Sequence, residues 1–261
     1  MNIYVINLDR HPERYGRLHA LLAGQGATVK RVRAVDGARL RERGRPARRR
    51  RGALSAGNIA LSRFEIAIAT SHRIAWRKFL ASGAPMCAVL EDDAVLGADF
   101  AAFLARSSAA MGAFDWVKLE TFPNWKVIVE PSAAPPILGR RICRLRSTHM
   151  GAAGYVVTRA GAMRLMALSA GAPLGADTIL FDIERLRFVR PALRIGQVVP
   201  APVAQADTLG GDKGALTSYV GSRRGARSGF APLTPSKIWK EIVRPIRAAR
   251  LERLGAVVPF A

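Results

Sequence analysis

Residues 86–97 read MCAVLEDDAVLG, in which three consecutive carboxylates directly follow an apolar run. Met86 to Leu90 is a continuous apolar run of strand length, so Glu91, Asp92 and Asp93 are expected at the carboxyl end of a buried strand. In open α/β sheets, ligands bind at that edge. Adjacent carboxylates repel one another unless a cation neutralises them. The first hypothesis is therefore a cation bound at a strand end.

The segments before this stretch predict a βαβ unit. Residues 3–8 (IYVINL) have the length of a buried strand, and Pro12 followed by Glu13 opens a helical pattern. A second strand is expected over 29–35, ending at the turn pair Asp36-Gly37. Such a unit predicts a parallel pair of strands with a right-handed crossover.

The segments on either side of the acidic stretch extend the same pattern. Further helices are expected over 59–81, 98–111, 161–169 and 178–187, and further strands over 116–119, 152–157 and 193–199. The predicted fold class is α/β, with a mostly parallel central sheet flanked by helices over residues 1–206. The stretch 207–234 is rich in Gly, Ser and charge and is expected to be a flexible segment.

Two basic segments stand out. Residues 39–57 form a basic loop, whose run from Arg39 to Arg51 is either solvated surface or an anion-binding element. Residues 235–261 form a basic amphipathic tail, which either lies on an anionic membrane surface or packs on the domain. Pro245 would kink the tail if it formed one helix.

Composition bounds the class of protein and its partners. The chain has 261 residues and a net charge of +22, which favours acidic partners such as nucleic acid, anionic lipid, phosphorylated small molecules or glycans. The two cysteines, Cys87 and Cys143, lie far apart and indicate no disulfide framework, so a reducing cytoplasm fits best. The sequence shows no signal peptide pattern and no apolar run of spanning length, so we expect a cytoplasmic protein, soluble or peripheral on the inner membrane face.

Four separated segments carry a family likeness. They are Val5 to Arg10 with Glu13-Arg14; Arg33 to Gly37; Glu65 through Ser71-His72 with Trp76; and Val89 to Asp93. Residues 154–158, with Gly161-Ala162, Asp177 and Gln205, match more weakly. In this order the segments resemble glycosyltransferase family 25. The family usually reads Gly-Glu-Ile-Gly-Cys before its Ser-His pair, whereas this chain has Phe64 to Thr70 there.

The resemblance implies a GT-A-like nucleotide-binding fold and an inverting hexosyl transfer, with galactose favoured, from a UDP-sugar. The acceptor would be a hydroxyl of a lipopolysaccharide, lipooligosaccharide or other surface glycan, and the excess positive charge suggests that it is acidic. A divalent metal, Mn²⁺ or Mg²⁺, would be held by carboxylates together with the donor's phosphates.

Each candidate residue has a functional and a structural interpretation. Asp93 is expected as the principal metal ligand, with Glu91 as a second contact to the metal or the ribose and Asp92 in support. Asp177 is the first choice for the catalytic base but could be a helix N-cap; Glu120 is the alternative base. His149 is considered only as a third metal ligand.

The remaining candidates are expected to bind the donor. Asn7, Arg10, Arg14 and Asp36 lie at or just past strand ends, where a nucleotide would sit, and Glu65 and His72 match the family. Arg14 could equally be an exposed helix residue, and His72 a hydrogen-bonded core residue.

Two other functions are compatible with a basic protein that carries an acidic cluster. A metal-dependent nuclease would need further carboxylates placed for two metals. A nucleic-acid-binding protein would need aromatic residues interleaved with the basic loop, which that loop lacks, so nucleic acid is not the expected partner.

Overall fold

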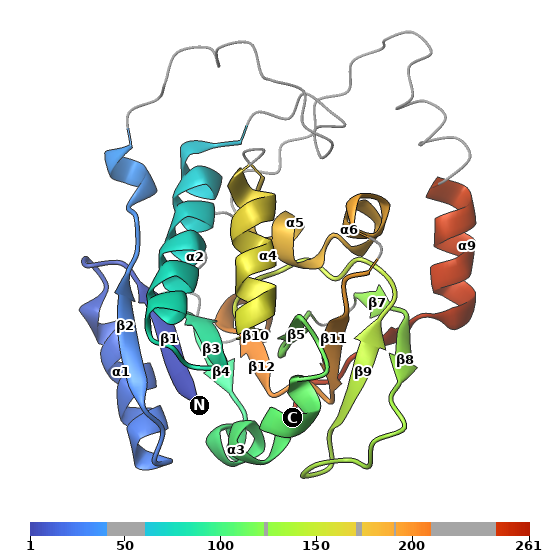
Figure 1. The fold of residues 1–261 in the computed structure, drawn as a ribbon, viewed down its shortest axis with the longest axis horizontal. Coiled ribbons are helices and arrows are strands. Elements are labelled where there is room, and N and C mark those ends of the chain that lie inside the picture. Colours follow the sequence, from blue (N-terminus) through green and yellow to red (C-terminus); the bar gives the residue numbers. More distant parts are fainter. Residues whose placement is uncertain (41–60, 123–124, 171–173, 191, 210–243) are drawn as a thin grey trace, which may run out of the picture.

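The computed structural model describes residues 1–40, 61–122, 125–170, 174–190, 192–209 and 244–261 (Figure 1). The predicted basic loop at 39–57, beyond residue 40, lies outside the described residues, as do most of the predicted flexible segment and the first part of the tail. Within the described ranges, no helix is both long enough and apolar enough to span a bilayer.

A central sheet of eight strands organises the described part of the chain. Its order is β2-β1-β3-β10-β5-β11-β9-β8. The bounds are β2 Val29–Arg33, β1 Asn2–Asn7, β3 Met86–Glu91, β10 Gly154–Thr158, β5 Trp116–Lys118, β11 Ile195–Val199, β9 Arg141–Leu145 and β8 Val129–Pro131. Strands β1, β2 and β3 are mutually parallel, and β5 and β11 are parallel. Only β10 and β9 run against the common direction, so the expected mostly parallel sheet is confirmed.

Helices cover both faces of this sheet. They are α1 Pro12–Gly24, α2 Arg63–Ala81, α3 Phe100–Met111, α4 Arg159–Ala170, α5 Ala176–Phe181 and α6 Ile183–Val189, with short 3-10 helices at Gly37–Arg39 (η1) and Ala206–Thr208 (η2). Side chains alternate along each strand, so Tyr4 and Val89 pack toward α2, α4, α5 and α6. Val5 and Leu90 pack on the opposite face with α1 and α3. The predicted α/β class is confirmed.

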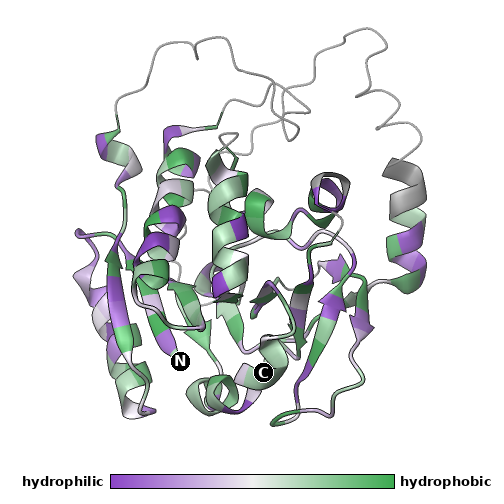
Figure 2. Cartoon of the chain, in the orientation of Figure 1, coloured by the Kyte–Doolittle hydropathy of each residue, from purple (hydrophilic) through white to green (hydrophobic). Residues whose placement is uncertain are grey.

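Hydropathy follows these layers. In Figure 2 the central strands are coloured as hydrophobic, whereas the edge strands β2 and β8 carry more hydrophilic residues. A strand buried on both faces needs apolar residues at successive positions, as in the run Cys87 to Leu90. The apolar run that precedes the acidic triplet is therefore the direct consequence of its central place in the sheet.

A second, smaller sheet begins directly after the acidic triplet. It consists of β4 Ala94–Leu96, β12 Val203–Gln205 and β6 Glu120–Thr121. Asp92 and Asp93 therefore occupy the turn where the chain leaves the central sheet. The backbone amide of Ala206 donates to the Asp93 carbonyl at 3.2 Å, so the end of β12 covers this turn.

The end of the chain packs on the domain. Helix α9 Arg244–Leu254 carries Pro245 in its first turn, where proline is tolerated. Strand β13 Ala256–Val257 then pairs with β7 Lys126–Val127. Val258 is buried, and its carbonyl accepts from Thr121 Oγ1 at 2.5 Å. The tail was predicted either to lie on a membrane or to pack on the domain, and residues 256–261 pack on the domain.

One predicted helix is wrong. The helix expected over 178–187 is two short helices, because the chain breaks at Asp182. The Asp182 carboxylate accepts from the backbone amide of Arg185 at 3.3 Å and caps α6. Aspartate favours such a cap over a helix interior, since its short side chain competes for backbone hydrogen bonds.

Candidate functional site

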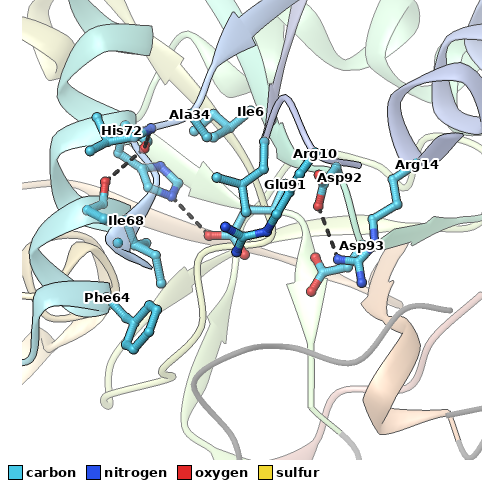
Figure 3. A pocket seen from close by; sticks show the side chains of 15 residues that line it. Ile6, Arg10, Arg14, Ala34, Phe64, Ile68, His72, Glu91, Asp92 and Asp93 are labelled. Atoms are coloured by element: carbon cyan, nitrogen blue, oxygen red, sulfur yellow. Dashed lines mark hydrogen bonds and ion pairs between the residues drawn. The ribbon is translucent and has the colours of Figure 1, made fainter. Parts of the chain in front are cut away.

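The candidate site lies where β1 and β3 end side by side. Because β1 pairs in parallel with both β2 and β3, the residues that follow all three strands meet at one edge. A pocket of about 710 Å³, partly open to solvent, occupies this edge. That volume includes space open to solvent. Six residues predicted from the sequence line it, namely Arg10, Arg14, His72, Glu91, Asp92 and Asp93 (Figure 3).

Asp92 is held by polar partners from the first βαβ unit. Asn7, buried at the end of β1, donates from Nδ2 to Asp92 Oδ2 at 2.7 Å and accepts from Arg31 Nε at 2.8 Å. Arg14 Nη1 lies 3.6 Å from Asp92 Oδ1. Arg17 donates to the carbonyls of Asp92 and Ala94 at 3.2 and 2.9 Å. Asn7 thus connects the end of β1 to the turn that follows β3.

The segment after β2 forms the opposite wall of the pocket. Asp36 caps η1 by accepting from the Ala38 amide at 2.9 Å and forms an ion pair with Arg10. The Val35 amide donates to Ser71 Oγ at 2.9 Å, which ties this segment to α2. A Cβ on Gly37 would lie only 2.7 Å from the Phe64 ring, so a glycine is needed where this turn meets α2.

Four side chains form a continuous hydrogen-bonded series, which we call the Glu91 chain: Trp76, Tyr155, His72 and Glu91. Trp76 Nε1 donates to the Tyr155 hydroxyl at 2.7 Å, and that hydroxyl lies 2.9 Å from His72 Nδ1. His72 Nε2 lies 3.0 Å from Glu91 Oε1 (Figure 3). The chain runs from the core between α2 and β10 to the pocket at the end of β3.

Burial and mutual repulsion set the charges of the acidic triplet. Burial, with the carboxylates of Asp92 and Asp177, raises the pKa of Glu91 to about 7 against the opposing effect of Lys118. Burial, followed by repulsion from Glu91, Asp92 and Glu120, raises the pKa of Asp93 well above its ordinary value. Asp93 Oδ1 is buried and finds no hydrogen-bond partner among the described residues. A cation bound beside Asp93 would therefore stabilise the ionised form of its carboxylate.

A second buried polar group, which we call the Lys118 cluster, comprises Lys118, Glu120, His149 and Gln197. Lys118 and Glu120 have fully buried side chains, with Nζ 2.9 Å from Oε2. Lys118 also donates to the Gly151 carbonyl at 2.6 Å. Gln197 donates from Nε2 to the carbonyls of Glu120 and Val198, so its Oε1 faces His149 Nδ1 at 2.8 Å. In the described part of the protein, Glu120 Oε1 and His149 Nε2 have no hydrogen-bond partner.

The two base candidates differ in access. Glu120 is sealed, because Gly151 packs so closely that an added Cβ would lie 2.7 Å from Oε1, and burial raises the pKa of this carboxyl. Asp177 is only partly buried and lies in the first turn of α5, after the N-cap Gly175. The N-cap interpretation of Asp177 is therefore wrong, although its Oδ1 accepts from the Thr178 amide at 2.7 Å.

Two further sequence candidates lie at the margin. Glu65 forms a capping box with Ser62, whose amide donates to Glu65 Oε2 at 2.8 Å and whose hydroxyl accepts from the Glu65 amide at 3.2 Å. Glu65, Asn7, Asp36, Glu120 and Asp177 are not among the pocket-lining residues. Their roles in binding or catalysis stay predictions.

The residues fit a divalent cation in part. Within the described ranges, no set of three or more His, Cys, Asp or Glu side chains is arranged to hold a metal ion. However, Asp93 Oδ1 is buried beside Glu91 without a protein partner in the described chain. Two carboxylates completed by substrate phosphates and water are a normal oxygen set for Mg²⁺ or Mn²⁺. His149 is directed toward Gln197 rather than Asp93.

Sequence reasoning missed Lys118 and the role of Tyr155. Both are polar side chains within apolar strand segments, WVKLE and GYVVT. A buried lysine or tyrosine hydroxyl is retained only where it has a partner. The sequence offers such a partner for Lys118, because Glu120 lies two positions further along an extended segment and so projects from the same face.

Comparison with known proteins gives the family. A sequence model of the family described as "Glycosyltransferase family 25 (LPS biosynthesis protein)" matches residues 1–180. A similar protein is the lacto-N-neotetraose biosynthesis glycosyltransferase LgtB of Neisseria meningitidis serogroup B, 34% identical over 56% of this chain and 54% of that protein. Another is the lipooligosaccharide biosynthesis protein lic2B of Haemophilus influenzae, 28% identical over 77% of this chain and 78% of that protein.

These matches differ in extent. The chain matches only about half the length of LgtB. Among solved structures, A197 from STIV overlaps with a TM-score of 0.38 and 13% identity, over 75% of this chain and 80% of that one. That overlap is too weak to carry an argument.

Proposed function

Because this chain belongs to glycosyltransferase family 25, we propose that it transfers a sugar from a nucleotide-sugar donor to a hydroxyl of a lipopolysaccharide, lipooligosaccharide or related surface glycan. The observation that carries the proposal is the pocket at the ends of β1 and β3, where Glu91 and Asp93 face Arg10 and Arg14. A diphosphate needs positive charge near its oxygens, and both signs of charge are present there.

The donor is proposed to be a UDP-hexose, with galactose favoured. Arg10 and Arg14 would contact the diphosphate, while Asn7 and Asp36 hold the two strand ends that carry them. Asp93, with Glu91, would hold a Mn²⁺ or Mg²⁺ ion, which supplies positive charge to the departing diphosphate when bound. The unpaired Asp93 Oδ1 among the described residues supports this role.

Asp177 is the proposed base for an inverting transfer. A single displacement requires a base that reaches the acceptor hydroxyl from the side opposite the leaving diphosphate. Partial exposure of Asp177 supports this assignment, together with its electrostatic influence on Glu91 and His72. Glu120 is less suited, because its side chain is fully buried and paired with Lys118.

The acceptor is proposed to be acidic. Arg144, Arg187 and Arg190 line a second pocket beside α6 and the start of β11. Burial and the nearby guanidinium groups of Arg146, Arg144 and Arg250 lower the pKa of Arg187. Converging like charges are stabilised by an anion, so this surface suits a phosphorylated glycan. Arg187→Ala should raise the KM for acceptor, while Arg106→Ala on α3 should not.

The basic tail is proposed to add a peripheral membrane contact at the inner membrane face. Helix α9 exposes Arg250 and Arg253, whereas Val258 is buried in the domain. Arg250→Gln with Arg253→Gln therefore tests the charge without removing the packed end of the chain. Sedimentation with anionic vesicles should fall in the double variant; unchanged sedimentation would remove the membrane role.

Isothermal titration tests the donor site directly. UDP-galactose, UDP-glucose and UDP-N-acetylglucosamine would be titrated with and without Mn²⁺ into the wild-type protein and Asp93→Ala. Metal-dependent binding of one nucleotide sugar, lost in the variant, is the expected result. If none of the three bound, the proposed donor site would be abandoned. If one nucleotide sugar binds, it would next be used as the donor in an assay of glycan transfer.

A further inference from the structure

The Glu91 chain joins residues that are far apart in the sequence, and three of its four side chains are fully buried. Trp76 and His72 lie on α2, Tyr155 lies on β10 and Glu91 ends β3. Trp76, His72 and Tyr155 each have essentially no exposed surface. The His72 and Tyr155 rings are stacked, with centroids 5.7 Å apart. Packing thus restricts each ring to the position in which its hydrogen bonds form.

The hydrogen atoms along this chain can be assigned from its first member. An indole nitrogen only donates, so the Tyr155 oxygen accepts from Trp76 Nε1. The tyrosine hydroxyl then has its own hydrogen to place, and His72 Nδ1, at 2.9 Å, is its acceptor in the described chain. His72 therefore carries its hydrogen on Nε2, which donates to Glu91 Oε1 at 3.0 Å. All three hydrogen bonds point toward the Glu91 carboxylate.

The environment of the imidazole agrees with this neutral tautomer. The His72 side chain has no exposed surface, and burial away from water disfavours a charged imidazolium. A neutral imidazole has one donor and one acceptor, and here both are engaged.

We propose that Tyr155 is a positioning residue: its hydroxyl fixes His72 as the Nε2–H tautomer, which holds the Glu91 carboxylate in one orientation at the donor pocket. The inference rests on the proposed function, since it gives Glu91 a donor or its metal to face. Groups that orient a ligating carboxylate from behind commonly change affinity about 10- to 100-fold when removed. Tyr155 itself does not line the pocket.

His149 supplies an internal reference. Its Nδ1 faces Gln197 Oε1, because the Gln197 amide nitrogen donates to two backbone carbonyls. His149 therefore carries its hydrogen on Nδ1, the opposite tautomer. The whole chain contains only four histidines, so the two buried imidazoles can be distinguished by substitution.

The first experiment records ¹⁵N spectra of the full chain labelled at histidine, with no donor present. His72 should show the Nε2–H tautomer and His149 the Nδ1–H tautomer. In Tyr155→Phe, the Nδ1 resonance of His72 should shift toward that of an imidazole nitrogen without a hydrogen bond, while His149 stays unchanged. A His72 hydrogen on Nδ1 in the wild type would overturn the inference.

The second experiment measures affinity for the UDP-sugar and Mn²⁺ by titration. Tyr155→Phe should weaken binding about tenfold. Tyr4→Phe is the matched control, because Tyr4 is a buried tyrosine on β1 whose hydroxyl donates a long hydrogen bond to the Lys78 carbonyl, at 3.5 Å. His72→Gln, which keeps an N–H donor for Glu91, should retain more affinity than His72→Leu.

The outcomes separate the two proposals. Equal affinity in Tyr155→Phe and Tyr4→Phe would overturn the positioning role while leaving the proposed function intact. Absence of donor binding by the wild type would overturn the proposed function and the positioning role together, even with the tautomers as assigned. The expected tautomers with a selective loss in Tyr155→Phe would support both.

Discussion

The Glu91 chain and the Lys118 cluster are both buried, yet they are built differently. In the Glu91 chain, each imidazole and hydroxyl group is engaged, and the series ends at a carboxylate that lines the pocket. In the Lys118 cluster, a lysine and a glutamate pair beneath Gly151, and two polar atoms lack partners within the described residues. The hydrogen bonds of the Glu91 chain lead to a residue that lines the pocket, whereas those of the Lys118 cluster stay among buried groups.

This difference predicts whether a substitution mainly changes the free energy of unfolding or also changes donor binding. Removing one member of a buried ion pair leaves an uncompensated charge, so changes in the Lys118 cluster should lower the free energy of unfolding. Removing the Tyr155 hydroxyl from the Glu91 chain loses two neutral hydrogen bonds, about 1 kcal/mol each, and should also weaken donor binding. Donor binding is therefore expected to change only with substitutions in the Glu91 chain, and the free energy of unfolding is expected to fall most with substitutions in the Lys118 cluster.

The largest expected effect is that of Lys118→Met. Glu120 would keep its buried carboxylate without the ammonium group 2.9 Å away, and the free energy of unfolding should fall by about 3–5 kcal/mol. Denaturant unfolding measures it. The double variant Lys118→Met with Glu120→Gln should recover part of the loss; a loss below about 1 kcal/mol in the single variant would contradict a structural ion pair.

Gly151→Ala should come next. Gly151 has φ +98°, and an added Cβ would lie 2.4 Å from Phe122 Cε2 and 2.7 Å from Glu120 Oε1. The strained backbone and the contact together should cost about 2–3 kcal/mol. Gly139→Ala is the control, since Gly139 has φ +74° with no heavy atom within 4 Å of the added Cβ. Equal losses in the two variants would mean that the cover over Glu120 is loosely packed.

The buried neutral imidazole of His149 should make the free energy of unfolding fall at acid pH. Burial lowers its pKa from 6.5 to about 3, with further lowering by Lys118. As pH falls below 6.5, the unfolded chain binds a proton that the folded protein does not, so stability is lost on acidification. Between pH 7.5 and pH 5 this amounts to about 2 kcal/mol. His149→Gln should lose correspondingly less over that interval in denaturant unfolding. An identical pH dependence in both proteins would contradict a buried neutral imidazole.

The smallest change in stability, and one of opposite sign, is expected for Asp93→Asn. Burial and three neighbouring carboxylates disfavour the Asp93 charge, so its removal should stabilise the fold by about 1 kcal/mol. Titration with UDP-sugar and Mn²⁺ should show that binding is lost at the same time. Asp92→Asn is the comparison variant, and it should not stabilise the fold, because the Asp92 carboxylate already accepts a hydrogen bond from Asn7 and pairs with Arg14. Should Asp93→Asn lower the melting temperature instead, its charge would be stabilising.

Much of the fold was readable from local pattern. The apolar run before Glu91 and the Pro12 helix start mark element ends correctly, because strand length and proline act locally, whereas β2 ends at Arg33, two residues before its predicted end. The missed elements were β9, which has five residues, and the strands β4, β6, β7, β8, β12 and β13, which have two or three residues each; the break at Asp182 also divides what reads as one helix. Such short strands are defined by their pairing partners rather than by their own composition.

The sequence by itself determined the family, the acidic triplet at a strand end and the residue types that meet there. Tertiary structure alone decided which carboxylate is balanced by Asn7 and Arg14, which keeps a buried oxygen without a partner in the described chain, and which imidazole nitrogen faces Glu91. Tyr155 and His72 are 83 positions apart. Charge state and tautomer depend on burial and on the partners that packing brings within 3 Å, and no local pattern in the chain specifies those.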